Sequence, residues 1–82
     1  LQGMFRADLI DEEEAIDFYT QAARHAADVG DIGTRTLFEK IVLDEEGHKA
    51  WLELQLDLIE RLGEKTYCAK LVSFDADEED ED

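Results

Sequence analysis

The chain has 82 residues, of which 44% are hydrophobic, and carries 23 acidic and 8 basic residues for a formal net charge of −15. This length allows one small domain at most. The excess of negative charge repels nucleic acids and anionic membrane surfaces, so neither is an expected partner, whereas cations are. The single cysteine, Cys68, excludes an internal disulfide framework and favours a reducing cytoplasm as the location.

Two long helices are predicted from the absence of proline and from the positions of glycine. The sequence contains no Pro and five Gly, and proline is the strongest helix breaker. The first helix is expected over residues 4–29, with Gly30 ending it and Asp31 capping the next helix. The second is expected over residues 32–62 and ends at Gly63. The sequence therefore predicts an all-α fold built on a long antiparallel helical hairpin.

The C-terminal segment combines a short third helix, expected over residues 64–71, with an acidic end. Seven of the last eight residues are Asp or Glu, a composition typical of disordered segments. We therefore expect a helical hairpin domain over residues 1–72 and a disordered acidic tail over residues 73–82. The tail either serves solubility or concentrates cations by its charge.

Polar residues interrupt the apolar face on which the two helices are expected to meet. In the first helix, positions at alternating spacings of four and three are apolar except for one glutamate: Phe5, Leu9, Glu12, Ile16, Tyr19, Ala23 and Ala26. The matching positions of the second helix are Phe38, Ile41, Glu45, His48, Leu52, Gln55, Ile59 and Leu62. A buried carboxylate without a partner is costly, so these acids need a compensating cation.

Glu45 and His48 are three residues apart and therefore lie on one face of the second helix. This Glu-x-x-His arrangement is the one that di-iron carboxylate bundles use, and Glu12 from the facing helix would supply a third ligand. Carboxylate oxygen and imidazole nitrogen suit Fe, Mn or Zn. The alternative is a solvated surface pair, because Glu-x-x-His is common by chance in acidic helices. The position on an apolar face favours the metal site formed by Glu12, Glu45 and His48.

A second apolar stripe on the same helix runs through Leu43, Gly47, Trp51, Leu54 and Leu58. Two helices alone cannot cover such a stripe, so we expect it to be buried against another chain. Among the neighbouring residues, Asp44 either orients a histidine from an opposing helix or is a solvated acid. Tyr19 is expected to pack in the core, and His25 is expected at the surface.

Two segments of the sequence resemble bacterioferritins. Residues 4–9 (MFRADL), followed by Glu12, resemble the start of their third helix. Residues 44–59 (DEEGHKAWLELQLDLI) resemble their fourth helix, and this match is the more specific of the two. Leu62, Gly63 and Tyr67 resemble the entry into their short C-terminal helix. The resemblance implies a fold that is half of a ferritin-like four-helix bundle.

The resemblance also implies a function. Glu12 matches a terminal carboxylate ligand, Glu45 the bridging carboxylate and His48 the imidazole ligand of a di-iron ferroxidase centre. Such a centre oxidises Fe(II) to Fe(III), which passes to a mineral inside a hollow shell. The rest of the ligand set, and the methionine that binds haem, lie in two helices that precede the matching segment in that family. Iron is therefore the expected cofactor, and haem is not expected from this chain alone.

Half of a site needs a partner to complete it. Either a second copy of the chain in a homo-oligomer or a complementary N-terminal ferritin half would supply the other three ligands. Two alternative functions remain open from the sequence. The first is a non-catalytic helical subunit of a ferritin-like assembly. The second is a peroxide reductase of the rubrerythrin type, which uses the same Glu-x-x-His arrangement.

Overall fold

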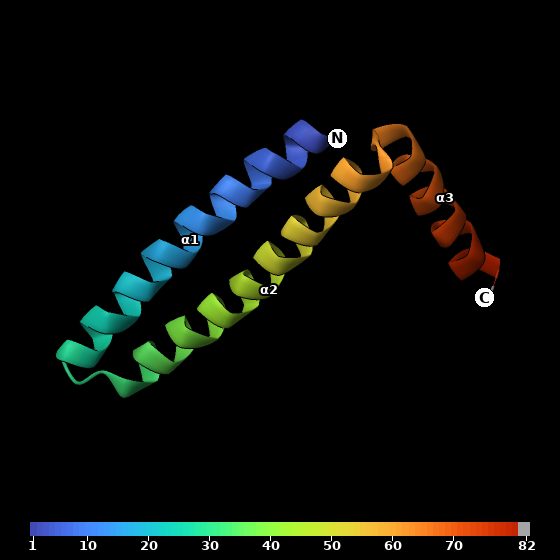
Figure 1. The fold of residues 1–82 in the computed structure, drawn as a ribbon. Coiled ribbons are helices and arrows are strands. Elements are labelled where there is room, and N and C mark those ends of the chain that lie inside the picture. Colours follow the sequence, from blue (N-terminus) through green and yellow to red (C-terminus); the bar gives the residue numbers. More distant parts are fainter. Residues whose placement is uncertain (81–82) are drawn as a thin grey trace.

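The computed structural model describes the backbone of residues 1–80 and the side chains of residues 1–72. It contains the helices α1 (Gln2–Asp28), α2 (Ile32–Leu62) and α3 (Glu64–Asp80). In Figure 1, α1 and α2 lie side by side and antiparallel, and α3 leaves the end of α2 at an angle, near the N-terminus. The predicted all-α hairpin is confirmed. No helix within residues 1–80 is long and apolar enough to cross a membrane.

The turn between α1 and α2 is formed by Gly30 and Asp31. Gly30 adopts a positive φ of 78°, and the Asp31 N–H donates to the carbonyl of Ala26 at 2.8 Å, which closes the end of α1. The Asp31 carboxylate then accepts hydrogen bonds from the Thr34 N–H at 3.1 Å and from the Thr34 hydroxyl at 2.6 Å. One residue thus caps α2 directly after the turn, which fixes how the two helices face each other.

α3 is anchored to the hairpin by Tyr67. The Tyr67 side chain is buried, and its hydroxyl donates a hydrogen bond of 2.6 Å to Oε1 of the buried Gln55 on α2. Phe5 of α1 packs edge-on against both Tyr67 and Trp51, at centroid distances of 6.4 and 5.6 Å. Burial raises the pKa of the Tyr67 hydroxyl above its ordinary value. The phenol therefore stays protonated and keeps donating to Gln55.

α3 is longer than the helix expected over residues 64–71. Its backbone continues to Asp80, through most of the segment for which disorder was predicted. No Gly or Pro occurs between residues 64 and 80, so nothing in the sequence breaks the helix. Residues 81–82 of the predicted tail lie outside the described part of the chain, and the division into two domains stays a prediction.

The hairpin is a single layer with little core of its own. The whole chain, with α3 included, has extents of 51 × 31 × 15 Å. Among the described side chains, the buried ones are Ala23, Ala26, Leu52, Gln55, Ile59 and Tyr67. The stripe predicted to meet another chain is open, since Leu43, Trp51 and Leu54 are 67%, 52% and 53% exposed. Its burial by a partner stays a prediction.

The Asp31 cap makes the stability of the hairpin sensitive to acid. Hydrogen bonds from Thr34 lower the pKa of the Asp31 carboxyl, so the cap stabilises the fold above the unfolded-state pKa. That contribution is lost as the pH falls through the lowered, folded-state value. We expect Asp31→Ala to lower the melting temperature at neutral pH, measured by circular dichroism. Asp31→Asn keeps the capping oxygen and should melt normally at neutral pH, without this part of the acid sensitivity; equal losses in both variants would contradict the assignment.

The Tyr67 hydroxyl should matter more to stability than an ordinary tyrosine hydroxyl. Tyr67→Phe leaves the buried Gln55 oxygen without its donor, which costs about 1–3 kcal/mol in the free energy of unfolding. Urea denaturation of the full chain measures this loss. Tyr19→Phe is the matched control, because Tyr19 is half-buried and packs on Phe38 at 5.9 Å through its ring. A loss of similar size in both variants would show that the hydrogen bond to Gln55 is not what anchors α3.

Candidate metal centre

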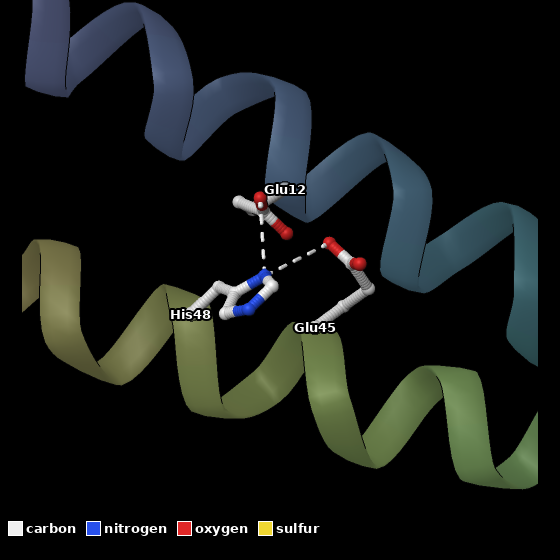
Figure 2. A group of neighbouring side chains, drawn as sticks. All are labelled: Glu12, Glu45 and His48. Atoms are coloured by element: carbon white, nitrogen blue, oxygen red, sulfur yellow. Dashed lines mark ion pairs between the residues drawn. The ribbon is translucent and has the colours of Figure 1, made fainter.

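The three predicted ligands come together midway along the hairpin. Glu12 lies on α1, and Glu45 and His48 lie one turn apart on α2, facing it (Figure 2). One donor atom from each residue can be chosen so that all three lie within 4.8 Å of one another. Among the described residues, this is the cluster of His, Cys, Asp and Glu side chains that could hold a metal ion.

The imidazole of His48 lies between the two carboxylates. Its Nδ1 atom is 3.7 Å from Oε1 of Glu12 and 3.8 Å from Oε2 of Glu45 (Figure 2). Both distances are too long for a hydrogen bond. Two donor atoms that each lie about 2 Å from one ion are up to about 4 Å apart. The spacing therefore fits donors that share an ion better than donors that bond to each other.

Burial distinguishes the carboxylates from the histidine. The Glu12 and Glu45 side chains are 22% and 23% exposed, whereas the His48 side chain is 65% exposed. The Oε2 atom of Glu12 is buried and has no hydrogen-bond partner. An orphaned carboxylate oxygen beside a second acid is costly unless a positive charge neutralises it. The donor set of two carboxylates and one imidazole fits a divalent ion such as Fe, Mn or Zn.

Beside the cluster lies an open, acidic pocket of about 300 Å³. Asp8 and Asp11 of α1 line it together with Glu12, and Trp51 and Leu52 of α2 line it together with His48. Neither Asp8 nor Asp11 was among the ligands predicted from the sequence. The signal was the position of Asp8, which lies one turn before both Asp11 and Glu12 and is therefore a neighbour of each on the helix surface.

The other residues singled out in the sequence lie outside the cluster. Tyr19 packs between Phe18 and Phe38, at centroid distances of 5.2 and 5.9 Å, which confirms its packing role. His25 is exposed, as predicted. Asp44 is also exposed, and its role in orienting a histidine of an opposing helix stays a prediction.

The sequence and the fold are similar to those of bacterioferritins. The bacterioferritin of Rhodobacter capsulatus is 42% identical over 61 residues, which are 74% of this chain and 38% of that protein. The bacterioferritin of Mycobacterium avium is 44% identical over 73 residues, which are 89% of this chain and 46% of that protein. The chain thus spans less than half the length of these relatives.

A solved structure of Rhodobacter capsulatus bacterioferritin matches the fold with a TM-score of 0.80 and 37% sequence identity. The match covers 82% of this chain and 42% of that one. That protein is described as having a metal-free dinuclear site and a haem iron. The family model of the ferritin-like domain matches residues 1–62, which include both long helices and all three clustered residues. The chain therefore belongs to the ferritin-like family.

Proposed function

We propose that this chain contributes to iron storage by providing half of a di-iron centre at which Fe(II) is oxidised to Fe(III). The observation that carries the proposal is the cluster of Glu12, Glu45 and His48, with its unpartnered carboxylate oxygen between the helices. The likeness to bacterioferritins supports iron as the metal. The centre is complete only when a second hairpin adds its own ligands, because three protein donors are too few for two ions.

Each of the three residues has a distinct role in this proposal. Glu45 would be the carboxylate shared by the two ions, as the resemblance to bacterioferritins implies. Glu12 binds one ion from the opposite helix, and His48 offers its neutral imidazole nitrogen to one of them. Two carboxylates with low exposure favour the higher charge of Fe(III) over Fe(II), because the negative charge is screened little by water. The protein thus promotes loss of one electron from each Fe(II).

The electrons need an acceptor of matching capacity. Two Fe(II) ions release two electrons, and one hydrogen peroxide molecule takes up two electrons and two protons to give two water molecules; O₂ is the alternative oxidant. The exposed side of His48 and the open pocket beside it leave room for the oxidant and for the second ion. The Fe(III) product then moves on to a mineral store inside a shell of subunits.

The charge of the chain supports iron as a substrate that is attracted from solution. Asp8 and Asp11 lie in the pocket beside Glu12 and His48, and the whole chain carries a net charge of −15. Negative charge around a concave site raises the local concentration of cations. We assign the chain to the cytoplasm, where Fe(II) and a reduced Cys68 are both stable. No haem forms part of the proposal, because the resemblance implies that its ligand lies in helices preceding the matched segment.

The proposed function predicts that substitution of a single ligand slows iron oxidation. The assay mixes the chain with the N-terminal hairpin of Rhodobacter capsulatus bacterioferritin and follows the Fe(III) absorbance after Fe(II) is added. We expect Glu45→Ala and His48→Ala to slow the initial rate by at least about tenfold, because loss of groups that merely support a metal ligand already costs that much. Glu46→Ala is the matched control, since Glu46 is an exposed acid between them.

The same assay tests the alternative of a non-catalytic subunit. A helical partner without chemistry would bind the N-terminal hairpin equally well with Glu12→Gln, and the rate of iron oxidation would not change. Normal oxidation in Glu12→Gln, Glu45→Ala and His48→Ala would therefore remove the proposed function. A slow rate in Glu46→Ala equal to that of Glu45→Ala would show a general effect of charge instead of metal ligation.

A further inference from the structure

One face of the hairpin has a polar centre and apolar ends. We call it the pairing face. On α1, Met4 lies one turn before Asp8, and Phe18 lies two turns after Asp11, so all four follow one stripe. On α2 the corresponding stripe has Leu37 two turns before Asp44 and Trp51 one turn after His48. The four apolar members are strongly exposed, at 65% for Met4, 66% for Phe18, 55% for Leu37 and 52% for Trp51.

The metal cluster lies at the middle of this face. Glu45 is thirteen residues after Ile32, the first residue of α2, and His48 is fourteen residues before Leu62, the last. At 1.5 Å per residue, α2 therefore extends about 20 Å to either side of the cluster. Consider a twofold axis that passes beside the cluster, perpendicular to the helices and parallel to the pairing face. Such an axis would place two hairpins face to face along nearly their whole length. A cluster near one end would leave most of each hairpin unpaired.

The exposed area of the chain is larger than that of a compact fold of the same mass. A compact folded chain of 9.4 kDa exposes about 5,000 Å², whereas this chain exposes 6199 Å². The excess is about 1,200 Å², to which the projecting helix α3 contributes together with the open faces of the hairpin, and it is of the order that each subunit buries in a stable dimer. In this twofold arrangement, Met4 of one copy meets Phe18 of the other. Met4 lies about 12 Å before Glu12 along α1 and Phe18 lies about 9 Å after it, so the rotation brings the two side chains to similar levels.

We propose that the pairing face binds a second copy of this chain, whose own Glu12, Glu45 and His48 complete the centre, and that divalent cations drive the pairing. The role of the completed centre rests on the proposed function. Without cations, pairing brings two Glu12 and two Glu45 carboxylates together, with the neighbouring acids Asp8 and Asp11 of each copy. Like charges at such short range oppose association. Two divalent ions at the centre offset this repulsion, so metal binding and pairing are thermodynamically linked.

The test measures mass and iron content together. The full 82-residue chain is analysed by sedimentation velocity and native mass spectrometry under anaerobic conditions, with EDTA and with added Fe(II). The expected species is a monomer of 9.4 kDa in EDTA and a dimer holding two iron ions after Fe(II) is added. A chain that stays monomeric with Fe(II), or that dimerises equally well in EDTA, would overturn the proposal.

Matched substitutions locate the interface. Phe18→Glu places a charge on the pairing face and should weaken the Fe(II)-dependent dimer by at least about tenfold in Kd. Ile10→Glu adds the same charge at a side chain that is 57% exposed and lies outside the stripe, about 120° around α1 from Met4 and about 80° from Phe18; it should leave the Kd unchanged. Met4→Glu serves as a second pairing-face variant, with circular dichroism confirming that each variant folds. Equal weakening by Ile10→Glu and Phe18→Glu would contradict this interface.

Failure of the pairing is distinguishable from failure of the proposed function. If the chain stays monomeric with Fe(II) but oxidises iron when mixed with the N-terminal hairpin of Rhodobacter capsulatus bacterioferritin, the pairing is wrong and the function stands. If a dimer with two irons forms but does not oxidise Fe(II) faster than buffer, the pairing stands and the function is wrong.

Discussion

The Glu12 carboxylate, held between two helices without a hydrogen-bond partner for Oε2, is the constraint on which the rest of the structure depends. An apolar residue at this position would pack the hairpin without any polar cost. Glu45 raises the cost further, because it brings a second negative charge to the same level of the interface. The hairpin is therefore destabilised at its centre unless a cation is shared by these groups. The stability of the fold and the binding of metal are thus two consequences of one arrangement.

The thinness of the hairpin has a related cause. Ala23 and Ala26 let α1 approach α2 closely near the turn, while Leu52 and Ile59 fill the space towards the other end. These residues cover one narrow strip of each helix, and large apolar side chains on the remaining surface are open to water. A single layer of two helices buries too little apolar area to offset the entropy of ordering the chain. The fold and the metal centre are therefore both incomplete, and His48 and the exposed side chains of Phe18 and Trp51 lie on a face where a partner could complete both.

Much of this architecture could be predicted from the sequence, because its signals are local. Gly30 and Gly63 both adopt positive φ values, 78° and 82°, and they end α1 and α2 within one residue of the expected positions. The spacing of Glu45 and His48 along a helix fixes their common face, so the cluster with Glu12 followed from helix geometry once the two helices were assumed to pack. Its role as a metal centre remains an inference from donor chemistry and family.

The remaining features depend on tertiary geometry that periodicity does not encode. The hydrogen bond from Tyr67 to Gln55 joins residues on either side of the Gly63 turn, and the direction of α3 depends on the backbone angles of that turn. Gln55 interrupts the apolar face of the second helix in the sequence, and only the folded position of Tyr67 gives its side chain a partner. Asp8 and Asp11 border the pocket only because α1 and α2 leave space there. The length of α3 was underestimated because acidic composition outweighed the absence of any helix breaker in the prediction.

X-ray absorption spectroscopy at the iron edge tests whether Glu12, Glu45 and His48 form half of a centre for two iron ions. The protein is loaded anaerobically with Fe(II) in its assembled form. We expect iron–iron scattering at about 3.5–4 Å, together with an imidazole contribution that disappears in His48→Ala. A spectrum of isolated Fe(II) ions surrounded by oxygen alone, unchanged in His48→Ala, would contradict it.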